Sequence, residues 1–298
     1  MIDTPSTSFA AAVTPLNRKA MLVKLTCSKP TTSRRDKEVE AVVQAQYADT
    51  GLTVLQQLFK DKANPVRIVI NEASQVYTYH VAHTLPWSDR GPRMLPVEQY
   101  VAYSTAMRGL IGDVESSVAA LMPRYDALVQ QDIYSRGARA QLSDYPTAEE
   151  FKEKMQFKFF FSPLPDVSHF LFDINPEDKA ALTAQLEEVE KQAKNEVAGR
   201  IHAPLVHLVN KLKVGIGEPG AIFRDSAVEN VNEACDIARQ LAMGDETVLA
   251  MIDEVKQAIR PLVKGMHVVR ESPVERANAA NKLDEVAKKM SFMFGRAA

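Results

Sequence analysis

The feature that most constrains the fold is a stripe of apolar residues between positions 176 and 212. Its members recur at spacings of three and four, and charged residues occupy the opposite face, which is the pattern of an amphipathic α-helix. The stripe comprises Leu182, Leu186, Val189, Ala193, Val197, Ile201, Leu205, Leu208 and Leu212. Asn175-Pro176 predicts where the helix begins, because asparagine caps a helix and proline is favoured at its first position.

This stripe has two candidate partners, the chain's own helices or a coiled coil with another chain. Spacings of four outnumber spacings of three, and Pro204 interrupts the stripe. A coiled coil keeps an unbroken seven-residue repeat. We therefore expect packing within the chain, with coiled coil-like pairing as the alternative.

Helix start signals recur along the rest of the chain. Asn64-Pro65 repeats the Asn-Pro signal, and several capping residues stand three positions before an acid. These pairs are Ser33 with Asp36, Thr147 with Glu150, Ser226 with Glu229, and Ser272 with Glu275, while Asp245 caps a further helix. The sequence thus predicts a mainly α fold, a multi-helix bundle with long C-terminal helices.

Two segments depart from the helical pattern. Residues 20–27 alternate loosely and predict a short strand, and residues 157–174 are aromatic and β-branched around a Pro-rich centre. The second segment predicts a small extended or β-hairpin element. We expect an N-terminal arm at 1–19, a helical domain at 20–175, and a long-helix region at 176–298 that packs on it.

Composition excludes several classes of protein. The 298 residues are 46% hydrophobic and 25% charged, with a net charge of −2, so the whole molecule is not an electrostatic nucleic-acid binder. The only cysteines, Cys27 and Cys235, are too far apart for a thiolate zinc motif and fit a reducing compartment. No apolar run is long enough to span a membrane, and the first residues lack the basic region of a signal peptide. We expect a cytoplasmic protein.

No motif predicts catalysis. The Gly-rich segment 215–220 lacks the Lys-Ser/Thr of a phosphate loop, and no Gly-x-Ser-x-Gly elbow occurs. His80 and His83 share a helix face, but no second Glu-x-x-His pair accompanies them. Histidines near a helix C-terminus interact with the last carbonyls more often than they bind a metal. We expect no catalytic residue, no metal and no cofactor, and leave the metal question open for the two histidines.

A basic segment is the first candidate binding surface. Residues 18–37 carry seven cations and only one acid, Asp36. The cations are Arg18, Lys19, Lys24, Lys29, Arg34, Arg35 and Lys37. They could follow a phosphate backbone or an acidic partner surface, or belong to a solvated arm that lies on the protein body.

The second candidate surface is the segment 84–96, which contains Trp87, Arg90 and Arg93. Its prolines and glycine predict an ordered loop. Trp87, the only tryptophan, is either an exposed anchor for a partner or a side chain that packs against the ends of helices.

Six short motifs are spread over residues 20–175: Leu22–Thr26, Asp36–Val39, Thr84–Trp87, Gly91–Pro96, Asp144–Pro146 and Pro163–Pro165. In these motifs the chain resembles a family of phage and prophage proteins of unknown function. Members are often encoded near MoxR-like AAA+ ATPases and von Willebrand A-type proteins. The resemblance therefore implies an accessory of such an ATPase system, and it carries over no catalytic residue.

Together these observations predict a phage-encoded, non-enzymatic helical protein that binds another protein, with an AAA+ ATPase as the implied partner. Nucleic-acid binding through the basic segment is one alternative. A structural or assembly role in the virion is another, and the chain could also form a homo-oligomer.

Overall fold

The computed structural model describes residues 16–47, 51–88, 91–137, 140–165, 175–215 and 224–295, and the fold is mainly α, as predicted. The described residues form two compact units. Unit 1 contains those up to Val23, Ala82–Tyr100 and those from Phe161 onward, and unit 2 contains those within Lys24–Val81 and Val101–Phe160.

Unit 1 is discontinuous in sequence, which differs from the predicted boundary near residue 175. Leu22, Leu85 and Met94 are buried in the same hydrophobic core as the C-terminal helices. Periodicity identifies a helix from its own residues, but it does not reveal which distant segments share a core. The division into units therefore depends on contacts that no local pattern encodes.

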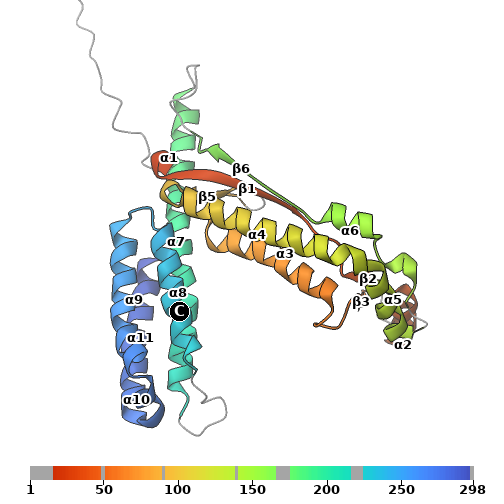
Figure 1. Cartoon of the computed structure of the whole chain (residues 1–298). Helices are drawn as coiled ribbons and strands as arrows, with labels where there is room; N and C mark the ends of the chain where they lie inside the picture. Colours follow the sequence, from red (N-terminus) through yellow and green to blue (C-terminus); the bar gives the residue numbers. More distant parts are fainter. Residues whose placement is uncertain are drawn as a thin grey trace, which may run out of the picture. The chain divides into compact units, whose positions relative to one another are not determined.

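Five helices make up most of unit 1. They are α7 (Pro176–Lys213), α8 (Ser226–Leu241), α9 (Glu246–Lys264), α10 (Met266–Glu271) and α11 (Pro273–Met293). α7 packs on α8 and α11, and α9 packs on both α8 and α11, so that these helices lie side by side (Figure 1). The apolar stripe from Ala193 to Leu212 is buried in their common core, which confirms packing within the chain over this part of α7.

A buried arginine donates hydrogen bonds to the backbone carbonyls at the C-terminal end of α7. Arg276 of α11 is buried, and it donates from Nε to the Leu212 carbonyl at 3.1 Å and from Nη2 to the Lys211 carbonyl at 2.8 Å. The last carbonyls of a helix have no partner within the helix. A cation at this end also interacts favourably with the helix dipole, so Arg276 joins α11 to α7.

A four-stranded sheet has the strand order β4-β5-β1-β6. Its strands are β1 (Ala20–Ser28), β4 (Leu85–Pro86), β5 (Arg93–Pro96) and β6 (Gln156–Pro163), and α1 (Leu16–Lys19) precedes β1. Leu22 lies opposite Met94, which in turn lies opposite Leu85, and both pairings are antiparallel. All three side chains point into the core of unit 1, so this register brings the first half of β1 to the C-terminal helices.

The strand predicted at 20–27 is confirmed as β1. Of the extended element predicted at 157–174, the first part is strand β6, whereas residues 166–174 lie outside the described residues. The segment 84–96 was expected to be a loop. It contains β4 and β5 instead, because these short stretches pair with each other and with β1.

The helices of unit 2 are α2 (Lys37–Tyr47), α3 (Pro65–Ala82), most of α4 (Tyr100–Leu121), α5 (Tyr125–Arg136) and α6 (Ala148–Lys154). A second sheet pairs β2 (Ser33–Arg35) with β3 (Leu55–Gln57) in antiparallel register.

Most of the predicted helix starts are confirmed. The side chains of Asn64, Thr147, Asn175, Asp245 and Ser272 each accept a hydrogen bond from a backbone amide of the first turn. The helices they cap begin one residue later, at Pro65, Ala148, Pro176, Glu246 and Pro273.

Two predicted capping pairs are wrong. Ser33 lies in β2, because the chain there pairs with β3, and the Asp36 side chain caps α2 by accepting from the Val39 amide at 3.1 Å. Ser226 is already the first residue of α8, and the capping position belongs to Asp225, whose side chain makes no capping bond.

Candidate protein-interaction surface

One end of unit 2 brings β2, β3, α2, the last turns of α5 and residues 140–145 together; we call it the tip. Backbone and side-chain bonds join its parts. The Asp36 amide donates to the Val54 carbonyl at 2.9 Å, and Gln44 Nε2 donates to the Leu52 carbonyl at 3.0 Å. The chain before β3 therefore runs along α2.

Helix α2 has an unusual distribution of polar and apolar residues. It buries the carboxylate residue Glu40, which is 4% exposed, and presents Val42 and Tyr47 to solvent together with Ala41 and Ala45. A helix that packs on a core normally does the reverse. The exposed residues of α2 thus include apolar side chains beside the polar residues Lys37, Glu38 and Gln46, and no described segment covers them.

Arg35 explains why Glu40 can be buried. Its Nε donates to Glu40 Oε2 at 2.6 Å, its Nη2 pairs with Oε1, and Gln44 Nε2 donates to Oε1 at 3.2 Å. The hydrogen bond from Arg35 holds the pKa of the Glu40 carboxyl below its usual range. A buried charge is tolerated when it is paired and hydrogen-bonded in this way.

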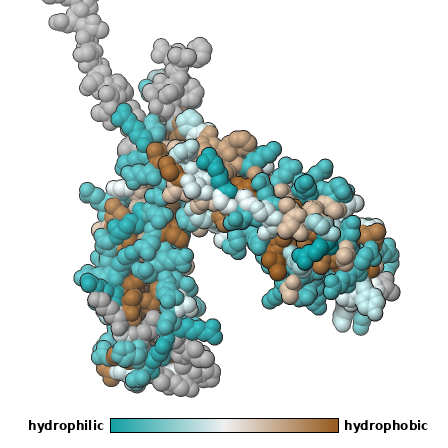
Figure 2. Space-filling view, viewed as in Figure 1, coloured by the Kyte–Doolittle hydropathy of each residue, from teal (hydrophilic) through white to brown (hydrophobic). Residues whose placement is uncertain are grey.

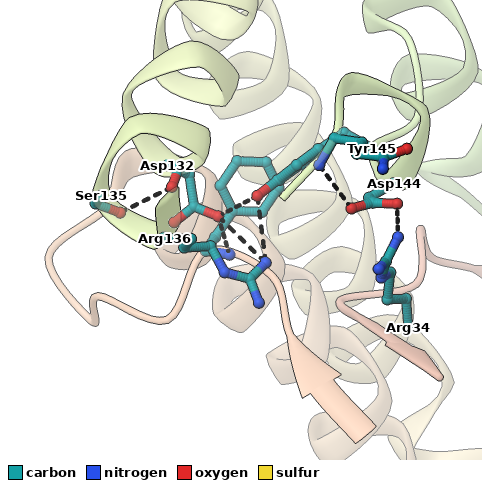
Figure 3. A network of polar contacts seen from close by, with 8 residues as sticks. Arg34, Asp132, Ser135, Arg136, Asp144 and Tyr145 are labelled. Atoms are coloured by element: carbon teal, nitrogen blue, oxygen red, sulfur yellow. Dashed lines mark hydrogen bonds and ion pairs between the residues drawn. The ribbon is translucent and has the colours of Figure 1, made fainter. Parts of the chain in front are cut away.

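A second buried carboxylate, Asp132 of α5, organises the other side of the tip (Figure 3). Its Oδ2 accepts from the Tyr145 hydroxyl at 2.6 Å and from the Phe59 amide at 3.1 Å, and Nη1 of Arg136 lies 3.8 Å away. The rings of Phe59 and Tyr145 meet edge to face with centroids 5.2 Å apart. Burial, and then the hydrogen bond to Asp132, raise the pKa of Tyr145. Asp132 thereby fixes three chain segments relative to one another.

Arg34 of β2 connects the two sides. It forms an ion pair with Asp144, as Figure 3 shows, and Asp144 Oδ2 also accepts from the Gln141 amide at 2.9 Å. The strand pair and the turn at 142–144 are therefore joined by one network of polar contacts. We call this network, made by Arg34, Arg35, Glu40, Asp132 and Asp144, the polar frame. A frame of this kind presents side chains in fixed positions, which lowers the entropic cost of binding.

Large apolar side chains surround this frame. The exposed ones are Val42 at 66%, Tyr47 at 69%, Leu55 at 64%, Tyr134 at 90% and Leu142 at 62%. Scattered exposed apolar residues are ordinary, but several at one end of a unit are characteristic of a protein-binding surface. The chemistry this surface offers is apolar contact together with hydrogen bonds from tyrosine hydroxyls.

The basic segment divides between the two units. Arg18 and Lys19 lie on α1 in unit 1, whereas the other five cations lie in unit 2. Arg34 and Arg35 are ion-paired within the tip, and Lys29 donates to the Ser74 hydroxyl at 3.2 Å. Lys24 on β1 and Lys37 at the start of α2 are exposed. Two of the predicted binding residues therefore help to build the tip's frame.

The second predicted surface is largely structural. Arg93 donates from Nε to Thr84 Oγ1 at 2.7 Å and from Nη2 to the Thr84 carbonyl at 3.0 Å. Arg200 of α7 donates to the same carbonyl at 2.7 Å. Trp87 is half-buried and packs against the core of unit 1, as the packing interpretation expected, and Arg90 lies outside the described residues.

The histidine pair has a structural explanation for its first member. His80 is buried, and its Nδ1 lies 2.6 Å from the Tyr103 hydroxyl. Among the described residues, no group of three or more His, Cys, Asp or Glu side chains could hold a metal ion.

The sequence did not predict the tip, because the helical periodicity of α2 does not show which of its faces points to solvent. One local signal could have indicated it, since Arg35 and Glu40 are close enough in sequence to pair across the start of a helix. Arg34 and Asp144, by contrast, are 110 residues apart in the sequence, and no local sequence pattern predicts that they pair.

No protein-family model, characterised protein or solved structure is significantly similar to the chain. None of the helices in the described ranges is both long and apolar enough to cross a membrane.

Proposed function

We propose that this chain is a non-enzymatic helical protein that acts by binding another protein through the tip. The observation that carries the proposal is that α2 buries the charged residue Glu40 and exposes the apolar side chains of Val42 and Tyr47. Exposing apolar residues while burying a charge costs stability in an isolated chain. A partner that covers these apolar side chains recovers that cost.

The composition of the tip supports a protein as the partner. Its exposed side chains include two tyrosines and three large aliphatic residues, and tyrosine is among the residues most enriched where binding energy concentrates. Its arginines are already paired with carboxylates, so they do not offer free charge to a phosphate backbone.

The family resemblance supports a MoxR-like AAA+ ATPase as that partner, in the cytoplasm of a phage-infected host cell. Two of the segments that carry the resemblance, Asp36–Val39 and Asp144–Pro146, contribute to the tip. The resemblance thus includes residues that build the proposed surface.

Binding between the purified full-length chain and the ATPase, measured by calorimetry, tests the proposal. We expect Val42→Ser combined with Tyr47→Ser to weaken binding at least about tenfold, which corresponds to about 1.4 kcal/mol. The matched control is Ile68→Ser with Tyr77→Ser, which removes exposed apolar residues of α3 in the same unit. Circular dichroism establishes that both variants fold.

Equal affinities of the two double variants for the ATPase would show that the tip does not take part in binding. If the wild-type chain binds no ATPase, and co-purification from infected cells recovers it alone as an inert monomer, the protein-binding proposal fails altogether. Salt-dependent binding to an oligonucleotide in place of the ATPase would favour the nucleic-acid alternative.

A further inference from the structure

Strand β6 is an edge of the four-stranded sheet in the part of the chain that the structure describes. It is eight residues long and contains Phe157, Phe159, Phe160 and Phe161. Proteins usually shorten, cover or charge such an edge, because its backbone groups can pair with a further strand. A long aromatic edge strand is therefore a candidate binding element.

The two faces of β6 differ. Phe157 is buried, Phe159 meets the Tyr103 ring edge to face at 6.2 Å, and Phe161 meets Tyr100 at 4.9 Å, so the odd-numbered residues face α4. Successive side chains of a strand point to opposite faces. Lys158 and Phe160 consequently point away from α4, and both are exposed, Phe160 by 59%.

The neighbouring strand β1 also carries exposed residues. Lys24, Thr26 and Ser28 alternate along it and therefore share one of its faces. All three are exposed. The exposed residues of β1 and β6 include two lysines and no acid, so these residues carry positive charge beside an exposed phenylalanine (hydrophobic residues lie at the surface over β6 in Figure 2).

We infer that the edge of β6 binds an extended, acidic segment of a partner protein as an additional strand. In this mode of recognition, backbone hydrogen bonds supply affinity and alternate side chains supply specificity. Apolar residues of the segment contact Phe160, and acidic residues lie near Lys158. The site is separate from the tip and does not depend on the function proposed for it.

A nucleic acid is the less suitable occupant. Single-stranded nucleic acids are bound by rows of stacking aromatic residues in a groove lined with cations. The exposed residues of β1 and β6 include one aromatic ring and two lysines among the described residues. What β6 offers in addition is a strand backbone, which only another peptide backbone matches.

Fluorescence anisotropy with the full chain tests the inference. The probe is a short labelled peptide of repeating Val-Thr-Glu-Thr, which places valine and glutamate in turn on one face of the strand, and the same peptide with lysine in place of glutamate is its control. Two further probes carry N-methyl groups on one or the other set of alternate amides, which blocks hydrogen bonding along a single edge of the peptide. We expect one N-methylated probe to bind like the parent and the other to lose at least about tenfold in affinity, because only one edge can face β6.

Protein variants locate the site. Lys158→Glu should lower the affinity for the glutamate peptide about fivefold and raise the affinity for the lysine peptide, as expected for an exposed charge contact. Val42→Ser with Tyr47→Ser should leave peptide binding unchanged, so failure of the tip proposal and failure of this one are distinguishable. No binding by the wild-type chain, equal affinity of both N-methylated probes, or stronger binding of a single-stranded oligonucleotide that displaces the peptide would overturn the inference.

Discussion

Replacing Asp132 with asparagine tests whether the polar frame holds the tip together. Oδ2 of Asp132 accepts from Phe59 at 3.1 Å and from Tyr145 at 2.6 Å, and lies 3.8 Å from Arg136. A hydrogen bond to a charged group contributes about 1.5–3 kcal/mol, and removing one partner of a buried ion pair costs about 3–5 kcal/mol. Asparagine keeps the shape and one acceptor oxygen. We therefore expect Asp132→Asn to lower the free energy of unfolding by about 2 kcal/mol, and Asp132→Ala by about 3–5 kcal/mol.

Urea unfolding followed by circular dichroism measures this change, and hydrogen exchange of residues 52–59 and 125–136 locates it. The control is Asp113→Asn, an exposed position of α4, where a change within about 0.5 kcal/mol is expected. If Asp132→Asn costs no more than the control, or if protection at 52–59 is unchanged, the carboxylate does not hold these segments and the reasoning is wrong.

Three further predictions concern the rest of the molecule. Arg276→Ala should cost about 2–4 kcal/mol in urea unfolding, because the last carbonyls of α7 lose a buried donor, and an unchanged midpoint would contradict this. Burial raises the pKa of Cys235 to about 12, so a thiol reagent should label Cys27 alone in the native protein and both cysteines after denaturation; labelling of both in the native state would refute it. Burial also raises the pKa values of Tyr125 and Tyr145, so folding favours the protonated phenols. Stability should be intact below the ordinary tyrosine pKa of 10.0 and decline as the pH rises beyond it, and a urea midpoint that stays constant up to about pH 11 would argue against this.

The elements that could be predicted from the sequence are those with a local physical cause. The caps at Asn64 and Asn175 depend on a side chain and an amide two residues away, and the stripe of α7 reflects the helical period itself. Ser33 failed as a cap because residues 55–57 pair with its segment and override the local preference. The strands at 85–86 and 93–96 were missed for the same reason, since neither is long enough to show a period.

The candidate surface was less predictable than the fold. Arg34 and Arg35 were identified as binding residues, but their carboxylate partners convert them into parts of a frame. Whether Val42 faces a core or solvent depends on what packs on α2, which is a property of the whole unit. Burial of Glu40 depends in the same way on a strand that forms only by pairing with a later one.

The division of the chain into units has a consequence for its synthesis. The chain passes from one unit to the other within β1, at the end of α3, within α4 and within β6, so no separate linker lies at these positions. As the polypeptide emerges from the ribosome, unit 2 is complete once Phe160 has been added, whereas the core of unit 1 still lacks every helix from α7 onward. Leu22, Leu85 and Met94 therefore remain without their final neighbours while more than a hundred further residues are translated. Domains generally fold as units during synthesis, and unburied apolar segments of this kind are where nascent chains engage chaperones or aggregate.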